Sequence, residues 1–142
     1  MTKIKKHQLI FENELDIEVF GISSASIDYR LAWELNSKLF IQFEKKSEKL
    51  IVEDKKTKTD NAFSYYYYFD EESLTKFYLI RNKQELKLLE SDKYFADYFF
   101  CLKNNNKYSE EKLLTEIRTI NAIVAVFALE TDELEFIEHL NE

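Results

Sequence analysis

A chain of 142 residues with 45% hydrophobic and 15% aromatic residues has the size and composition of one folded domain, not of a disordered segment. One glycine and no proline exclude the glycine-rich loops that bind phosphates or dinucleotides. The net charge of −7 comes mostly from the end of the chain, because six acidic residues and no Lys or Arg follow Arg118. No basic stripe of the kind that binds a nucleic-acid backbone is present, so we expect no direct DNA binding.

The first residues of the chain are basic, but no apolar signal core follows them, and no apolar run approaches the length of a membrane span. We therefore expect a cytoplasmic protein without a membrane-embedded segment. The single cysteine, Cys101, cannot form a disulfide within the chain.

The first third of the chain predicts two strands and then the clearest amphipathic helix. The strands are expected at residues 7–11 and 15–20, with a register break before Phe20, and Gly21 is expected where the strand gives way to the helix. One of the serines at positions 23, 24 and 26 is expected to cap the helix. Apolar residues at every fourth position predict its buried stripe: Ile27, Leu31, Leu35 and Leu39.

The middle of the chain predicts two hairpins. Residues 39–44 and 49–53 form the first, and the wholly polar residues 53–61 are expected to be a long loop. The aromatic run 62–70 predicts a strand with Tyr65 and Tyr67 on one side and Tyr66 and Tyr68 on the other. Residues 74–80 return the chain as the second hairpin.

The last third predicts a strand, a helix, a strand and a closing helix. Residues 94–102 are the most apolar strand, Ser109 is expected to cap the next helix, and residues 122–129 are expected to be an interior strand. This order implies a parallel pair joined by a right-handed crossover. Thr131 is expected to cap a final acidic helix.

These elements predict one α+β domain over residues 1–142. We expect a mostly antiparallel sheet with helices on one face and a C-terminal βαβ unit, in an arrangement related to the ferredoxin-like fold.

Two segments of the chain resemble the IPExxxVDY family of Bacteroidetes, a bacterial family of unknown function. The first runs from Gly21 to Leu39 and includes Gly21-Ile22-Ser23-Ser24, Asp28-Tyr29-Arg30-Leu31-Ala32-Trp33 and Leu35-Asn36. The second is the motif that names the family, in which Asp97-Tyr98 match, whereas Ala96, Asp92, Ser91 and Glu90 stand for its valine, glutamate, proline and isoleucine. The resemblance implies a shared fold and a bacterial cytoplasmic setting, and it assigns no activity, cofactor or catalytic residue.

The strongest candidate site is a group of four residues on the first predicted helix: Tyr29, Arg30, Trp33 and Asn36. Arg, Trp and Tyr often dominate protein interfaces, and a guanidinium over an indole adds a cation–π attraction. The structural alternative has Trp33 packed on the sheet, Arg30 paired with Asp28, Glu34 or Asp97, and Asn36 at the end of the helix. Both readings are open from the sequence.

Other chemistry has weaker signals. Asp92 and Asp97 with Tyr98 could act as an acid–base group, although Asp97 would more simply accept a hydrogen bond from a neighbour. His7, His139 and Cys101 have no metal-ligand spacing, so we expect no metal and no cofactor. The tyrosine run lacks the interleaved cations of a platform that stacks single-stranded nucleic acid.

Three functions are therefore carried forward. The leading one is a non-enzymatic protein-interaction module that binds another protein or a second copy of itself, with Tyr29, Arg30, Trp33, Asn36, Asp97 and Tyr98 as binding candidates. The second is a small-ligand regulatory domain similar to the ACT type, suggested by the closing βαβ pattern, although such domains commonly use glycine at the ligand turn, where this chain has Asn104-Asn105-Asn106. The third is an enzyme that uses Asp92 or Asp97 with Tyr98.

Overall fold

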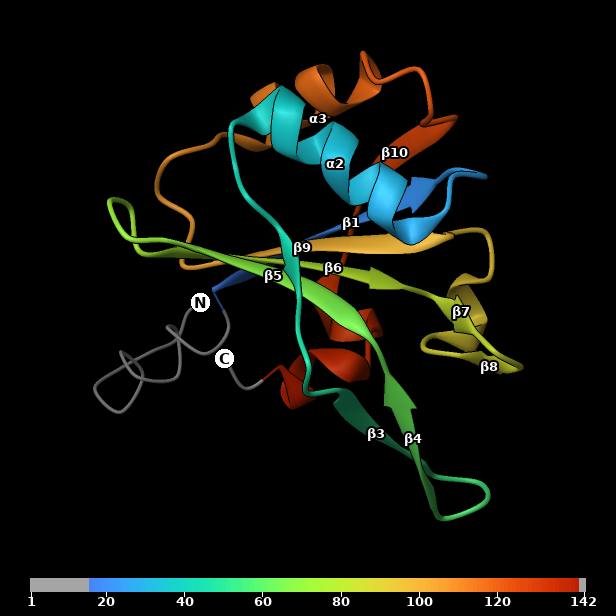
Figure 1. Ribbon diagram of the computed structural model, residues 1–142. Helices are drawn as coiled ribbons and strands as arrows, with labels where there is room; N and C mark the ends of the chain where they lie inside the picture. The colour runs from blue at the N-terminus through green and yellow to red at the C-terminus, as the bar shows by residue number, and fades with distance from the viewer. Residues whose placement is uncertain (1–15, 141–142) are drawn as a thin grey trace.

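A six-stranded sheet runs through the centre of the computed structural model, which describes residues 16–140 (Figure 1). The strand order is β10-β1-β9-β6-β5-β2, and every neighbouring pair is antiparallel. These strands are β1 (Ile17–Ser23), β2 (Glu44–Lys45), β5 (Tyr65–Asp70), β6 (Thr75–Arg81), β9 (Tyr98–Lys103) and β10 (Ala125–Leu129). The predicted antiparallel sheet of a single α+β domain is confirmed.

Helices α2 (Asp28–Leu39) and α3 (Glu110–Arg118) lie on one face of this sheet and contact each other (Figure 1). The other face carries a hairpin and two short 3-10 helices: β3 (Leu50–Asp54), β4 (Thr59–Phe63), η2 (Thr131–Glu133) and η3 (Phe136–His139). The chain between β6 and β9 forms β7 (Lys83–Gln84), β8 (Lys87–Leu88) and η1 (Ser91–Lys93). The α-helices therefore lie on one face, as predicted.

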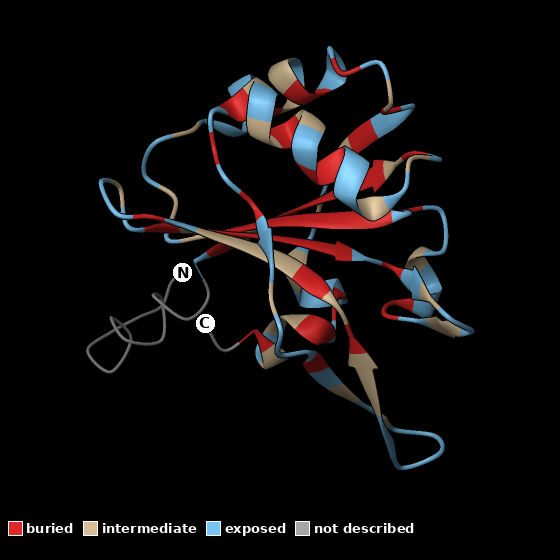
Figure 2. Ribbon diagram, in the orientation of Figure 1, coloured by how far each residue is buried: buried red, intermediate tan, exposed pale blue. Residues whose placement is uncertain are grey.

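Both faces of the sheet are buried, so the domain has two apolar cores (Figure 2). In β1, Phe20 and Ile22 face the helices, whereas Ile17 and Val19 face the hairpin and the 3-10 helices. This alternation is continuous, so the predicted register break at Phe20 is wrong. The predicted two-sided tyrosine strand is confirmed, because Tyr66 and Tyr68 pack on the helix-side core and the neighbouring tyrosines pack on the other.

Gly21 lies inside β1 and not at its end, so its predicted place between strand and helix is wrong. It is opposite Phe127 of β10 and Phe99 of β9. A Cβ at this position would lie 2.6 Å from a ring carbon of Phe127 and 3.3 Å from the Cβ of Ala96. The glycine is needed because the Phe127 ring lies directly over the backbone of β1.

Helix α2 buries Leu31, Leu35 and Leu39 as predicted, but Ile27 is 49% exposed. Ile27 is the extended N-cap residue, so the helical spacing does not begin until the residue after it. No serine side chain caps this helix, and that prediction is wrong. The Ser24 hydroxyl donates instead to the Ala122 carbonyl at 2.6 Å.

The first predicted hairpin is wrong. Strand β2 pairs with β5, whereas β3 pairs with β4, which includes part of the segment predicted as a long polar loop. That loop is reduced to a tight turn because the Asp54 carboxylate accepts from the Lys56 N–H at 3.0 Å and Lys58 adopts a left-handed backbone. The second predicted hairpin, β5–β6, is confirmed.

The C-terminal strand–helix–strand unit is present, with one difference from the prediction. Strands β9 and β10 run parallel, but β1 lies between them and is antiparallel to both. Among residues 16–140, β10 is therefore at the edge of the sheet and not in its interior. Ser109 caps α3 as predicted, since its hydroxyl accepts from the Lys112 N–H at 3.1 Å.

The predicted final helix is wrong, because the chain forms two 3-10 turns separated by the extended residue Leu134. This break places the Phe136 ring 5.1 Å from the Phe99 ring under the sheet. Thr131 is the first residue of the first 3-10 turn and not a capping residue before it, and the Glu90 carboxylate accepts from the N–H groups of Glu135 and Phe136 at 2.6 and 2.8 Å. The strand predicted at residues 7–11 lies outside the described residues.

Candidate interaction face of helix α2

The outward side of α2 exposes large aromatic side chains. Tyr29 is 64% exposed and Trp33 is 59% exposed, and their spacing of four residues places them on one side of the helix. Phe40, directly after the last turn, is 91% exposed. We call Tyr29, Arg30, Trp33 and Phe40 the α2 face. The structural reading in which Trp33 packs on the sheet is wrong.

Arg30 belongs to this face and not to the fold beneath it. Its guanidinium carbon lies 5.9 Å from the centroid of the Trp33 ring, and its Nε lies 3.5 Å from a Glu34 carboxylate oxygen. This confirms Glu34 as the pairing partner among the three expected. Because the pair is exposed, it contributes little to stability, but it orients the guanidinium beside the indole.

Asn36 has a structural position. Its side-chain oxygen accepts from the Phe43 N–H at 2.8 Å, and its carbonyl accepts from the N–H groups of Phe40 and Ile41. These bonds end the helix and direct the next segment towards the sheet. Asn36 therefore fixes the end of the α2 face without presenting its oxygen to a partner.

The sequence reading missed Phe40. This residue has φ 59° and ψ 46°, the left-handed conformation that glycine or asparagine usually adopts after a helix. Such a conformation costs free energy for a residue with a bulky side chain. The sequence has no glycine or proline at the end of this helix. That absence was the available signal that a residue with a bulky side chain would adopt the left-handed conformation here and point outwards.

Asp97 and Tyr98 anchor the loop that precedes α2. The Asp97 carboxylate accepts from the Ser24 N–H at 2.8 Å, and the Tyr98 hydroxyl donates to the Ser26 carbonyl at 2.5 Å. These bonds join segments more than 70 residues apart in the chain. The two segments that carry the family resemblance are thus held against each other, and this contact fixes where α2 begins.

Tyr98 is not placed for acid–base work. It is 1% exposed, and burial raises the pKa of its hydroxyl to about 12, even though the Arg81 guanidinium over its ring acts in the opposite direction. Asp92 is exposed on η1. Of the three residues of the enzymatic alternative, Tyr98 is therefore buried, whereas Asp92 and Asp97 are exposed and Asp97 uses its carboxylate to hold the loop before α2.

Cys101 is fully buried in β9, and burial raises the pKa of its thiol. His139 is partly exposed beside Glu138, while His7 lies outside the described residues. Across residues 16–140, no group of three or more His, Cys, Asp or Glu side chains is placed to hold a metal ion. None of the helices in this range is both long and apolar enough to cross a membrane.

No family model, curated protein or solved structure matches this chain. The resemblance to the IPExxxVDY family thus stays a prediction, and the assignment of a function depends on the geometry of this structure.

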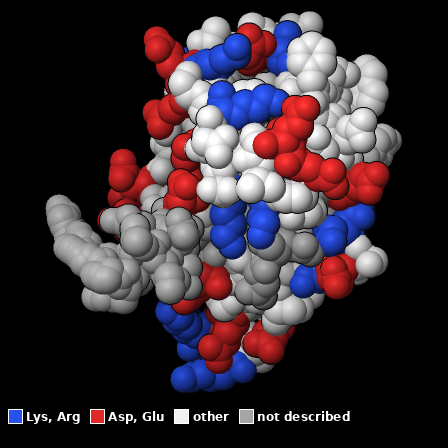
Figure 3. All heavy atoms as spheres, turned by 90° about the vertical axis from the view of Figure 1, so that its left-hand side faces the viewer, with Lys and Arg blue, Asp and Glu red and all other residues white. Residues whose placement is uncertain are grey.

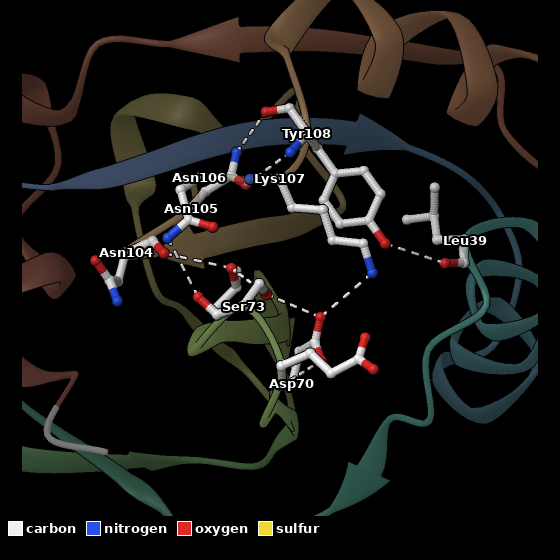
Figure 4. Close-up of polar contacts among 10 residues, drawn as sticks. Leu39, Asp70, Ser73, Asn104, Asn105, Asn106, Lys107 and Tyr108 are labelled. Atoms are coloured by element: carbon white, nitrogen blue, oxygen red, sulfur yellow. Dashed lines mark hydrogen bonds and ion pairs between the residues drawn. The ribbon is translucent and has the colours of Figure 1, made fainter.

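The corner at residues 104–108 uses its three asparagines to hold the chain together (Figure 4). The Asn104 and Asn106 amides donate to the carbonyls of Leu74 and Ser73 at the β5–β6 turn. The Asn105 amide donates to the Tyr108 carbonyl at 2.7 Å. The turn where an ACT-type domain was expected to have glycine therefore carries asparagine side chains that bond to the protein's own backbone.

Asp70 is the centre of the adjoining turn (Figure 4). The Ser73 hydroxyl donates to its carboxylate at 2.8 Å, and the Lys107 ammonium lies 3.4 Å away. The Ser73 hydrogen bond, with smaller contributions from Glu72 N–H and Lys107, lowers the pKa of Asp70 below its ordinary value of 3.8. A carboxylate of lowered pKa stabilises the fold above pH 3.8, and this stability is lost as the pH falls through the folded-state pKa.

Replacement of Asp70 with asparagine should therefore remove part of the acid sensitivity of the fold. We expect the free energy of unfolding of Asp70→Asn to fall less steeply than that of the wild type as the pH drops below 3.8. Urea unfolding on either side of this pH measures the difference. Asp60→Asn, at an exposed aspartate of β4, should keep the wild-type pH profile. Equal profiles for all three proteins would contradict the assignment.

Two clefts in the described part of the molecule do not involve the anchor formed by Asp97 and Tyr98. One of about 440 Å³ is lined by residues that include Tyr65, Tyr78 and His139, and one of about 470 Å³ lies beside Phe40, Tyr68 and Lys107. Neither cleft is lined by Asp92, Asp97 or Tyr98. Lys, Arg, Asp and Glu are interspersed on the side of the molecule that carries the β5–β6 turn (Figure 3).

Proposed function

We propose that this chain is a non-enzymatic protein-interaction module that binds a protein partner through the α2 face. The observation that carries the proposal is the exposure of Tyr29, Trp33 and Phe40 along one helix and its end, with the Arg30 guanidinium beside the indole. Tryptophan, tyrosine and arginine are the residue types that most often carry the binding energy of an interface.

The α2 face is also mounted rigidly, which supports a role in recognition. Leu31 and Leu35 are fully buried beneath it, Asp97 and Tyr98 hold the loop before it, and Asn36 holds its end. A rigid aromatic surface loses little conformational entropy when it binds. The partner best matched to this face carries an apolar groove bordered by a carboxylate that can pair with Arg30.

The strand order supports a ferredoxin-like arrangement, which we propose for the fold. Strands β1, β6, β9 and β10, in the order β10-β1-β9-β6, surround two crossovers that each contain one helix, α2 or α3. Strands β2 to β5 form an insertion between α2 and β6. The resemblance of residues 21–39 and of Asp97-Tyr98 is what supports a place in the IPExxxVDY family, which we also propose.

The two alternatives have weaker support. The ACT-type alternative expects glycine at the ligand turn, whereas residues 104–106 are asparagines whose amides bond to the protein itself. An enzyme based on Asp97 and Tyr98 would need a hydroxyl that a substrate can reach, whereas Tyr98 is 1% exposed and its hydroxyl donates to the Ser26 carbonyl.

Affinity capture from the native host tests the proposal if it compares matched variants. Tagged wild-type protein should recover a partner, and the double variant Tyr29→Ala/Trp33→Ala should recover at least about tenfold less of it. Tyr94→Ala is the matched control, since Tyr94 is 76% exposed on a different element and should leave recovery unchanged. Equal recovery by the double variant, or no protein recovered by the wild type, would refute the proposal.

A further inference from the structure

The cleft of about 470 Å³ begins where the α2 face ends. It is lined by Phe40 and Ile41, by residues 68–72, and by Lys107 and Tyr108. Phe40 belongs to the α2 face, and the Tyr108 hydroxyl donates to the carbonyl of Leu39, the last residue of α2, at 3.3 Å (Figure 4). The cleft is therefore attached to the last turn of α2 and continues the α2 face.

Two tyrosine rings in this cleft are held in place from beneath. Tyr68 and Tyr108 are half-buried, and both pack against the buried Phe77, with ring centroids 5.7 and 6.0 Å apart. Phe40 and Phe69 add exposed rings to the same lining. Because the face of an aromatic ring attracts a cation, these rings favour a positively charged ligand over an anion.

Lys107 shows how this lining holds an ammonium. Its Nζ lies 5.3 Å from the centroid of the Tyr108 ring and 3.4 Å from an Asp70 carboxylate oxygen (Figure 4). The Tyr108 side chain, followed by the Asp70 carboxylate, raises the pKa of Lys107. The combination of a tyrosine ring and a carboxylate thus stabilises a charged ammonium at this place in the fold.

Two further carboxylates in the cleft are not used in this way. Glu71 and Glu72 are exposed in the β5–β6 turn, and neither forms an ion pair within the described residues 16–140. The lining has three acidic residues and one basic residue, which gives it a formal charge of −2. A wholly apolar segment in this cleft would take both glutamates out of water without a partner, whereas a cation would pair with them.

We propose that the cleft beside Phe40 binds a lysine side chain of the protein partner, with its ammonium against the Tyr68 ring and paired with Glu71 and Glu72. This inference rests on the proposed function of the α2 face and adds the chemistry of the partner. Ten residues separate Arg30 from Phe40, which is about 15 Å along the helix. The partner therefore carries a carboxylate for Arg30 and a lysine at roughly this distance from it, and the two opposite charges fix its direction along α2.

A small probe tests the cleft without the partner. N-acetyl-lysine N-methylamide should shift the backbone amide signals of residues 69–72 in NMR spectra, with a dissociation constant on the order of 10 mM. N-acetyl-norleucine N-methylamide has the same side-chain carbons without the ammonium and should leave these signals unchanged. The absence of a saturable shift with the lysine probe, or an equal shift with the norleucine probe, would overturn the proposal.

A charge-neutral variant of the turn tests the two glutamates. Glu71→Gln/Glu72→Gln changes only exposed side chains and should weaken binding of the lysine probe by at least about threefold. The matched control Glu53→Gln/Asp60→Asn removes the same charge from an exposed pair that is opposed in the β3–β4 ladder, and it should bind the probe as the wild type does. Equal affinity of the probe for the wild type and for the turn variant would overturn the proposal.

Removal of the resident ammonium should have the opposite effect. Lys107→Met leaves the Tyr108 ring and the Asp70 carboxylate without their cation, so the variant should bind the lysine probe at least about twofold more tightly. Weaker binding would mean that the lining does not select an ammonium, and it would count against the proposal.

Affinity capture separates this inference from the function proposed for the α2 face. The Glu71→Gln/Glu72→Gln variant should recover at least about threefold less partner than the wild type, and its matched control should recover the wild-type amount. Full recovery by the turn variant, together with loss in the double variant of the α2 face, would overturn the lysine site alone. Loss of the partner only in the turn variant would support the lysine site and refute the α2 face. If the wild type recovers no partner, the probe titration decides.

Discussion

Replacement of Leu31 with alanine is expected to lower the free energy of unfolding by about 2–5 kcal/mol. Leu31 is fully buried in the core between the sheet and the helices, where it packs with Leu35 and the strand residues Phe20 and Phe100. Removal of its side-chain carbons loses their transfer free energy and leaves a cavity, because a sheet buried on both faces has little freedom to close around the gap.

Leu86→Ala is the matched control for this prediction. Leu86 is 95% exposed at the β7–β8 turn, so the same chemical change should alter the free energy of unfolding by about 0.5 kcal/mol or less. Urea unfolding of both variants gives the comparison. A Leu31→Ala cost below about 1 kcal/mol would mean that the buried side of α2 is assigned wrongly.

Asn82→Asp is expected to be about as damaging, at roughly 3–5 kcal/mol, although it changes the size of the side chain hardly at all. Asn82 is 1% exposed. Its amide nitrogen donates to the carbonyls of Lys93 and Ala96 at 3.1 and 3.0 Å and lies 3.4 Å from that of Glu90. An aspartate oxygen in this position would face those carbonyls with a negative charge and no donor.

Two measurements separate this effect from a general loss of packing. Asn121→Asp, at an exposed asparagine, should change the free energy of unfolding by about 0.5 kcal/mol or less. Protonation of the introduced carboxyl removes its charge, so the deficit of Asn82→Asp relative to wild type should shrink as the pH is lowered. A deficit that does not depend on pH would show that the charge is not its cause.

The parts of the fold that the sequence predicts well are those whose signals are local. The alternation in β1 and in the tyrosine strand, the leucine spacing of α2 and the serine before α3 each indicate an element correctly. In each case the residues that form the sequence pattern also make the contacts of that element. Contacts with distant parts of the chain therefore leave the prediction unchanged.

The misplaced elements depend on distant residues. In the closing segment, the Glu135 N–H donates to the Glu90 carboxylate 45 residues away in the chain, a contact that no local pattern indicates. The pairing of β3 with β4 depends on which polar residues form the turn, and the position of β10 at the edge depends on β1 entering between β9 and β10. Periodicity does not encode such choices of partner.

The residues of the candidate site also differ in whether a local sequence pattern indicates them. The aromatic residue types and spacing of Tyr29 and Trp33 were enough to name them as candidates, and the structure shows both exposed on the side of the helix away from the leucine stripe. Asn82 had no such signal, and for Phe40 the only signal was a helix end without glycine or proline. Their importance comes from a hydrogen-bond pattern and a backbone conformation that form only in the folded chain.

The central claim is that α2 holds the fold with one side and leaves the other free to bind. Urea unfolding of Trp33→Ala tests it most directly, because the same helix provides the buried comparison in Leu31→Ala. We expect Trp33→Ala to change the free energy of unfolding by about 1 kcal/mol or less, since the indole is 59% exposed. A loss as large as that of Leu31→Ala would place Trp33 in the fold and contradict the claim.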